Sequence, residues 1–241
     1  MRIAELLVNA TSKVSRYLNR DLSELVHLQN NQRKDHFVAK SYTKAKETIT
    51  SELEEKFEGR LPKLSFHQVP PQGTEGQTCI FIELLEGNAN FTHAIPYFGN
   101  VLTFAKYQNG DWKGIASVVD MPGLMEVIWT QHNFGAQKKA YSFDNNAQSR
   151  LRCSHQQAWE DAFVISFTGK VPAKHIRYFG SNCASLSLVL NGQADAVIAT
   201  NLHIATKLAF ELFAQEALGQ YSNHEGKHIV SGRAMPTLFK S

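Results

Sequence analysis

The hydrophobic period of the chain changes near residue 78, and this change constrains the fold more than any other feature of the sequence. Before it, apolar residues recur every three or four positions, as on one face of an amphipathic helix. After it, they gather in short runs bounded by turn residues, a pattern typical of strands. The sequence therefore predicts helices first, then a mainly antiparallel sheet, then alternating strands and helices. That order describes an α+β layered protein.

Two helices are predicted before the change of period. The first covers residues 3–27 and the second covers 41–57, with a polar break at Asn30–Arg33 between them. Segment 1–20 has four basic residues and one acid, which resembles an organelle transit peptide, but its apolar stripe favours a core helix. Residues 62–77, rich in Pro and Gly, are predicted to form an irregular connection.

An antiparallel meander is predicted for residues 78–150. It begins with a buried strand at Thr78–Leu85. Two further β-rich segments, 99–107 and 113–119, flank Asn109-Gly110, which is a strong signal for a tight hairpin turn.

The chain is predicted to divide near residue 150, where the antiparallel meander ends. Residues 1–150 are expected to form an N-terminal α+β half with two helices and the antiparallel sheet, and residues 151–241 a C-terminal α/β half. The two halves are expected to pack tightly as one unit. The elements predicted in the second half are a strand at 165–167, a helix at 184–190, a strand at 194–200 and a helix at 208–217.

Composition excludes several classes of protein. With 43% apolar and 20% charged residues, the 241-residue chain is neither disordered nor fibrous. A net charge of +3 does not by itself predict nucleic-acid binding, and no apolar run is long enough to suggest a membrane span. Three scattered cysteines indicate reduced thiols in an intracellular protein, of the cytoplasm or an organelle matrix.

Most standard catalytic motifs are missing from the sequence. It contains no glycine-rich phosphate loop, no H-E-x-x-H and no G-x-S-x-G. His224 and His228 have a spacing of four but lie in a Gly-containing region, which does not favour metal ligation. Asp120, which stands two residues before a proline, is predicted to be a turn residue rather than a general base.

One local cluster of acids could bind a metal. Glu83 and Glu86 end the buried strand and are followed by Gly87 and Asn88. Carboxylate and amide oxygens at a strand end are ligands that Mg²⁺ accepts. The alternative interpretation is a solvated turn that contains two acids.

The order of several short motifs resembles the inositol monophosphatase family over about residues 35–240. Each motif is weak by itself, but their order is the order of the family. Phe37-Val38-Ala39-Lys40 resembles its F-V-T-K entry, Glu83 to Phe91 stands where it has D-P-I-D-G-T-T-N-F, Val118 to Ala136 is similar to its G-x-V-Y-D-P…G-x-G-A hairpin, Gly180 to Ala196 matches its G-S-A-A…G-x-A-D-A segment, and Gln215 to Gly219 resembles x-E-A-G-G.

This resemblance implies a layered αβαβα fold and Mg²⁺-dependent hydrolysis of phosphate monoesters, in which clustered carboxylates hold the metals. It also implies that the metal site of this chain is degenerate. His67 stands in the place of the family's G-E-E acids, Glu83 and Glu86 replace its two motif aspartates, Asn88 replaces the neighbouring threonine, Thr206 replaces the aspartate of W-D, and Tyr42 replaces the acid of K-A-D.

Two functions are therefore open. Mg²⁺ demands near-octahedral oxygens at about 2.0–2.1 Å, which lengthened or deleted acids would not supply. The first hypothesis is a non-catalytic binding or scaffold subunit, without a cofactor, that joins protein partners in a larger complex. Family members in RNA-polymerase complexes make an RNA-associated assembly conceivable by analogy. The second is a divergent Mg²⁺-dependent hydrolase of inositol phosphate or a similar small phosphate, with Glu83 and Glu86 as weak metal ligands.

The sequence also carries expectations about the surface and about the energy of the two acids. An aromatic-rich set (Phe91, Tyr97, Phe98 and Trp129) favours a homodimer or heteromer, although these rings could equally fill the core. A basic set (Lys138, Lys139, Arg150 and Arg152) is expected to be a solvated face. If Glu83 and Glu86 repel one another without a metal, the loss of either carboxylate should cost no stability.

Overall fold

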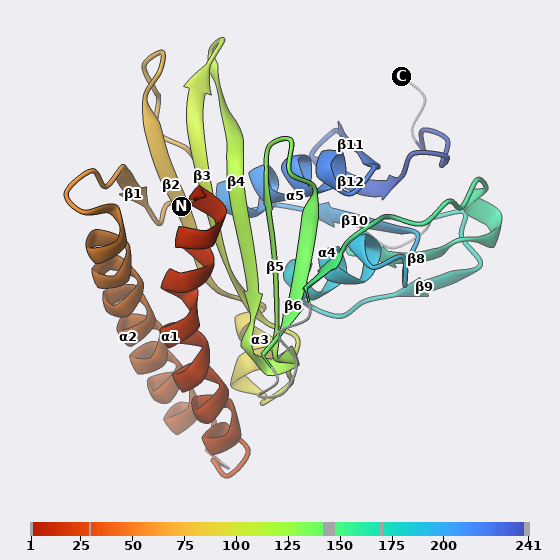
Figure 1. The fold of residues 1–241 in the computed structure, drawn as a ribbon. Helices are drawn as coiled ribbons and strands as arrows, with labels where there is room; N and C mark the ends of the chain where they lie inside the picture. The colour runs from red at the N-terminus through yellow and green to blue at the C-terminus, as the bar shows by residue number, and fades with distance from the viewer. Residues whose placement is uncertain (1, 29, 142–147, 169–170, 239–241) are drawn as a thin grey trace.

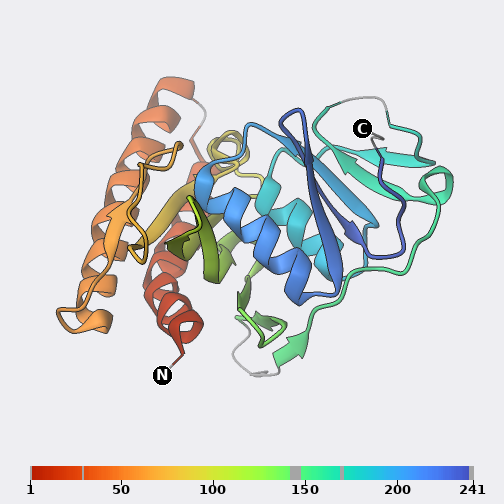
Figure 2. The same cartoon turned by 90° about the horizontal axis from the view of Figure 1, so that it is seen from above.

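Layers of helices and sheets alternate across the molecule when it is seen from above (Figure 2). The computed structural model describes residues 2–28, 30–141, 148–168 and 171–238. In Figure 1, α1 and α2 cover one face of the first sheet, and α4 and α5 lie between its other face and the second sheet. The layered α+β fold predicted from the sequence is confirmed. The outer face of the second sheet is covered by a one-turn helix, Trp159–Asp161, and by the chain around Met235.

The outer helical layer is an antiparallel pair. α1 (Ile3–Leu25) buries a stripe that includes Leu7, Val14 and Leu18. α2 (Asn31–Phe57) begins ten residues earlier than predicted, because the supposed polar break is its N-terminus. The side chain of Asn30 accepts a hydrogen bond from the backbone N–H of Arg33 at 3.3 Å, as an N-cap residue does.

The first sheet, sheet A, has its strands in the same order in space as in sequence. The β3–β4 hairpin is confirmed, and Asn109 (φ 53°) and Gly110 (φ 80°) form its left-handed turn. Part of the segment predicted to be irregular instead adds the short parallel strand β1 at the edge. The strands are β1 (Lys63–Ser65), β2 (Thr78–Glu86), β3 (Gly99–Gln108), β4 (Asp111–Met121), β5 (Glu126–Gln131), β6 (Ala136–Ala140) and β7 (Gln148–Arg150).

The second sheet, sheet B, is mixed, in the order β11-β12-β10-β8-β9. The predicted strands near 165 and 196 are β8 and β10, and the two predicted helices are α4 (Asn182–Leu190) and α5 (Ile204–Glu216). The β11–β12 hairpin and β9 were not predicted, because their short polar sequences show no clear apolar alternation. The strands are β8 (Phe163–Ser166), β9 (His175–Arg177), β10 (Ala196–Thr200), β11 (Gly219–His224) and β12 (Lys227–Gly232).

Two large apolar cores hold the layers together. One lies between the α1–α2 pair and sheet A, and the other joins sheet A, α4, α5 and the inner face of sheet B, so it contains residues from both sides of position 150. Phe91 and Phe98 are fully buried in the first core, with ring centroids 4.7 Å apart. These two rings therefore fill the core, as the alternative to a dimer interface supposed.

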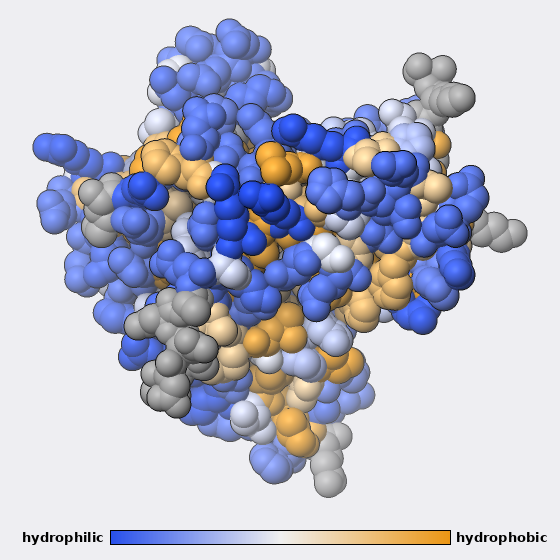
Figure 3. Space-filling model, turned by 45° about the vertical axis from the view of Figure 1, so that its right-hand side comes forward, coloured by the Kyte–Doolittle hydropathy of each residue, from blue (hydrophilic) through white to orange (hydrophobic). Residues whose placement is uncertain are grey.

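The surface is mainly hydrophilic, with scattered apolar patches on the face shown in Figure 3. In the described part of the chain, no helix has both the length and the apolar character needed to cross a bilayer.

Candidate functional site

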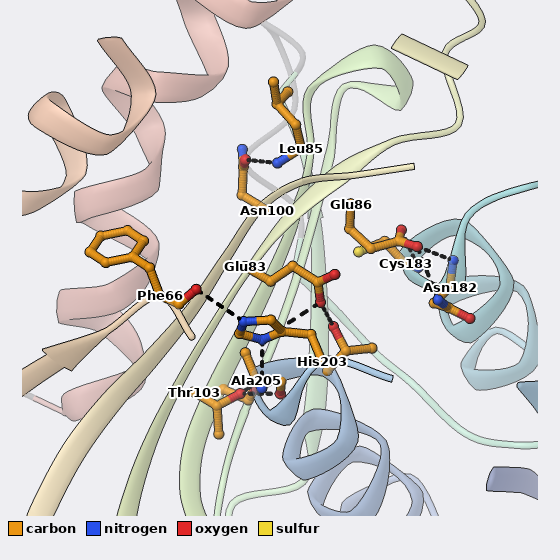
Figure 4. Close-up of polar contacts among 12 residues, drawn as sticks. Phe66, Glu83, Leu85, Glu86, Asn100, Thr103, Asn182, Cys183, His203 and Ala205 are labelled. Carbon is orange, nitrogen blue, oxygen red and sulfur yellow. Dashed lines mark hydrogen bonds and ion pairs between the residues drawn. The ribbon is translucent and has the colours of Figure 1, made fainter. Parts of the chain in front are cut away.

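The two motif glutamates lie where β2 ends, beside the start of α4 and the start of α5 (Figure 4). β2 has a bulge at this point, because Glu83 pairs with Val101 whereas Glu86 pairs with Gly99. Within the bulge Leu85 has a left-handed backbone (φ 53°), and its N–H donates to Asn100 Oδ1 at 3.1 Å. The bulge sends the two carboxylates toward different helices.

Glu86 fills the N-terminus of α4. Its Oε1 accepts from Asn182 N at 2.8 Å and from Asn182 Nδ2 at 3.1 Å. Its Oε2 accepts from Ser181 Oγ at 2.6 Å and from Cys183 N at 3.1 Å. The next backbone N–H, of Ala184, donates to the N-cap Ser181 Oγ. These contacts satisfy the first N–H groups of α4 and place a negative charge at the positive end of its dipole.

Glu83 has far fewer hydrogen-bond donors around its carboxylate than Glu86 has. Its Oε2 accepts a hydrogen bond from Thr206 Oγ1 at the start of α5, and His203 Nδ1 lies 4.0 Å from the same oxygen. This histidine is not a cation, because its Nδ1 already accepts from Ala205 N at 3.1 Å and burial lowers its pKa. Among the described residues, no lysine or arginine lies within 4.0 Å of either glutamate.

The titration of Glu83 follows from this environment. Burial is the main cause that raises its pKa to about 7, the nearby charge of Glu86 raises it further, and the hydrogen bond from Thr206 opposes the shift. At neutral pH a large fraction of Glu83 therefore carries a proton, because no lysine or arginine among the described residues lies within 4.0 Å to balance the charge of the ionised form. The interpretation of these two acids as a solvated turn is wrong, since Glu86 is only 8% exposed.

The other positions implied by the resemblance do not join the carboxylates, apart from Thr206. His67 is exposed in the loop after β1. Asn88 is exposed as the first residue of α3 (Asn88–Thr92), where it lines a pocket of about 430 Å³ together with Asp35 and Tyr42 of α2. Within the ranges that the structure describes, no three His, Cys, Asp or Glu side chains come together as a metal-binding group.

Asp120 is not a turn residue, because β4 continues through it and the side chain is fully buried. Its Oδ2 accepts from Ser15 Oγ of α1 and from Asn100 Nδ2 at 3.3 Å, and its Oδ1 accepts from Tyr141 OH at 2.9 Å. Burial raises the pKa of Asp120 to about 6. Because Asn100 also holds Leu85, this carboxylate supports the bulge that directs Glu86 to α4.

The magnesium that the resemblance implies does not fit this donor set. Mg²⁺ binds carboxylate oxygens that point into a shared cavity. Both oxygens of Glu86 already accept hydrogen bonds from the start of α4, and Glu83 shares one oxygen with Thr206. Both glutamates were identified from the sequence as candidate site residues, but their partners Ser181, Asn182 and His203 were not. A serine directly before a predicted helix was an N-cap signal that could have pointed to the first of these.

Glu83→Gln is expected to stabilise the protein at pH 8 and to have little effect at pH 5. Between the unfolded pKa of 4.5 and the folded pKa of about 7, the native state binds more protons than the unfolded state, so the free energy of unfolding falls as the pH rises. Removing the ionisable group should raise that free energy at pH 8 by on the order of 1–2 kcal/mol, after allowance for partial exposure.

Urea denaturation at pH 5 and pH 8 measures this effect. Glu54→Gln, at an exposed position of α2, is the matched control and should change stability equally at both values. A stabilisation of Glu83→Gln that did not grow with pH would contradict the assignment of an unbalanced charge to Glu83.

Comparisons with known proteins agree with this fold. The chain is 26% identical to an inositol-1-monophosphatase of Caulobacter vibrioides over 249 residues, covering 95% of this chain and 93% of the relative. The extragenic suppressor protein SuhB of Bartonella henselae superimposes with a TM-score of 0.74 at 22% identity, covering 97% of this chain and 94% of that chain. SuhB of Mycobacterium tuberculosis gives a TM-score of 0.75 at 17% identity, covering 97% and 91%.

No protein-family model matches the chain. The relationship instead rests on a curated relative matched over almost the whole length, on the shared layered fold, and on motifs that occur in the family's order from α2 to β11. On these grounds, the chain is similar to inositol monophosphatases over almost its whole length and shares their layered fold.

Proposed function

We propose that this chain is a non-catalytic member of the inositol monophosphatase family that works as a binding or scaffold subunit. The observation that carries the proposal is the environment of Glu86, whose two oxygens accept four hydrogen bonds from Ser181, Asn182 and Cys183. A carboxylate that completes a helix N-terminus is part of the fold rather than a free metal ligand.

The free-energy cost of moving the Glu86 carboxylate to a metal also supports a non-catalytic function. Moving its carboxylate would leave the N–H groups of Asn182 and Cys183 without acceptors, at about 1–3 kcal/mol for each buried donor. The other acid, Glu83, meets Thr206 where the family motif has an aspartate. A single partly protonated carboxylate is a poor basis for holding a metal and a phosphate together.

The proposal predicts that the protein has no Mg²⁺-dependent activity and no metal-dependent stabilisation. We expect no hydrolysis of inositol 1-phosphate, and a rise in melting temperature below about 2 °C with millimolar Mg²⁺ or Mn²⁺, because a ligand that binds the native state must stabilise it. The Caulobacter vibrioides relative, assayed beside it, is the positive control.

The alternative function is a divergent Mg²⁺-dependent hydrolase of inositol phosphate or a similar small phosphate. It would appear in the same assay as Mg²⁺-dependent turnover by the unmodified chain that disappears in Glu83→Gln and Glu86→Gln. That outcome would refute the non-catalytic proposal.

A scaffold function requires a partner, so we also propose that the chain assembles with another protein, with a second copy of itself, or with both, in a complex that could include RNA. An intracellular location is part of this proposal, and it is supported by three buried free cysteines, Cys79, Cys153 and Cys183. Co-purification from native extract and sedimentation at micromolar concentration test it. Sedimentation only at the 27.0 kDa of one chain, with no co-purifying protein, would contradict it.

A further inference from the structure

A pocket of about 230 Å³ lies between the start of α1 and the β5–β6–β7 part of sheet A, on strands other than the one that bears the two glutamates. The N-terminal end of α1 lies against the sheet in Figure 1, and Ala4 N donates to Gln131 Oε1 of β5 at 3.3 Å. The pocket is smaller than the roughly 300–1,000 Å³ of drug-sized sites, which suits one ring system. Its wall includes Arg2, Trp129, Gln131, Phe134, Gln137 and Gln148.

The strand register explains why these side chains share one face. Trp129 is paired with Gln137, and Gln137 with Arg150, so the three side chains form a row across β5, β6 and β7. Gln148 is paired with Lys139, two positions further along β6, and therefore points to the same side. This face continues beyond the part of sheet A that α1 covers.

Flat groups that can stack on a ring form part of the wall. Phe134 is 45% exposed, and the guanidinium of Arg2 lies over its ring, 4.3 Å from the centroid. Trp129 packs on the core with one side and is half-buried. Aromatic rings and arginine planes are the surfaces on which single nucleic-acid bases stack.

Three glutamine amides supply the polar part of the pocket. Gln131 uses Oε1 for Ala4 N and keeps its NH₂ group for another acceptor. Within the described residues, the side chains of Gln137 and Gln148 form no hydrogen bond. An amide offers a donor and an acceptor side by side, which matches the edge of a nucleobase.

The charge around the pocket is positive. Arg2, Lys139 and Arg150 are basic, Glu5 is the acid in the pocket wall, and Glu216 contacts the wall from outside by accepting a hydrogen bond from Gly135 N at 2.8 Å. The Arg150 guanidinium lies over the backbone of Gly135 at the pocket wall, since a Cβ at that glycine would be 2.7 Å from Nη2. In the described part of the chain, neither Lys139 nor Arg150 has a carboxylate partner within 4.0 Å.

From these observations we infer that the pocket binds a nucleotide, with the base inside and the phosphate outside. The base stacks against Trp129 and Phe134 and meets the glutamine amides at its edge, while Arg2 and Arg150 attract the phosphate. A neutral sugar would leave these cations unused, and an apolar ligand would leave the amides unpaired. The inference does not depend on whether the protein is catalytic.

Titration with adenosine, guanosine, cytidine and uridine 5′-monophosphates tests the inference, with tryptophan fluorescence and calorimetry as readouts. Trp112 and Trp159 are only 2% and 6% exposed, so quenching by a stacked base should come from Trp129 and disappear in Trp129→Phe. Phe134→Ala and Arg2→Ala should each weaken binding by about tenfold. Tyr178→Ala, at an aromatic residue that is 68% exposed and remote in sequence, should leave binding unchanged.

A single-stranded RNA octamer and inorganic phosphate complete the experiment. Equal binding of monophosphate and octamer would indicate a free nucleotide, and binding of the octamer at least tenfold tighter, with strong salt dependence, would indicate a strand; both support the inference. Inorganic phosphate should not compete at the same concentration. The inference is refuted if no nucleotide binds at millimolar concentration, if phosphate competes equally, or if Phe134→Ala and Arg2→Ala bind as well as the parent.

Discussion

Replacing Glu86 by glutamine is expected to lower the free energy of unfolding by about 2–4 kcal/mol, which reverses the sequence-based expectation that the loss of this carboxylate costs no stability. Each carboxylate oxygen of Glu86 faces two donors, Asn182 N and Nδ2 on one side and Ser181 Oγ and Cys183 N on the other. In either orientation, the new NH₂ group would therefore face a backbone N–H. The substitution also removes the negative charge from the N-terminus of α4.

The matched control is the same substitution three residues earlier on the same strand. Glu83→Gln keeps an oxygen that can accept the hydrogen bond of Thr206, and it removes an unbalanced charge, so its effect at pH 8 should have the opposite sign. Urea denaturation of both variants at pH 8 measures the difference. If the two variants changed stability by the same amount, the assignment of Glu86 as the structural acid would be wrong.

Replacing Asp120 by leucine is expected to lower the free energy of unfolding by about 3–5 kcal/mol. The substitution would remove the acceptor of three buried donors, the hydroxyls of Ser15 and Tyr141 and the amide of Asn100. These donors come from α1, from the chain after β6 and from β3. We therefore expect the outer helical layer and the β2 bulge to lose order together.

Asp120→Asn should lose less stability than Asp120→Leu, because it keeps one acceptor oxygen. Asp111→Leu, at the exposed start of the same strand, should stay within about 0.5 kcal/mol of the parent protein. Hydrogen exchange of the α1 amides distinguishes a local loss of order in the helical layer from a loss of stability of the whole protein. If Asp120→Leu were as stable as the parent, the desolvation cost of the Asp120 carboxylate would equal the stabilisation from its hydrogen bonds. The assigned structural role would then be wrong.

Much of the fold was predictable from local sequence. The apolar stripe of α1 and the Asn109-Gly110 turn act over a few residues, and both were placed correctly. The start of α2 was misplaced because an asparagine in a polar stretch is typical of a loop and of an N-cap alike. The β11–β12 hairpin was missed because its two strands have few apolar residues in alternation. They are stabilised instead by pairing with β10 and by packing against α5, which a short sequence window does not show.

Asp120 shows how a local pattern misleads. An acid shortly before a proline is a common turn signal, and in this chain the proline does begin a short 3₁₀ turn, Pro122–Leu124. The acid itself remains in the strand because Ser15, Asn100 and Tyr141 supply hydrogen bonds to it from other elements. None of these partners is visible within a short sequence window.

Local sequence patterns were enough to predict the layered fold, the resemblance to inositol monophosphatases and the positions of two acids at the end of one strand. From the sequence, both acids were predicted to have the same role as weak metal ligands, because they share one buried strand and one glycine turn. Only the tertiary structure distinguished them, since their hydrogen-bond partners lie 95 to 123 residues further along the chain. Glu86 meets the N–H groups that begin α4, whereas Glu83 meets one hydroxyl and a neutral histidine. The charge of a carboxylate is stabilised by the groups that surround it in space, and the fold alone decides which groups those are.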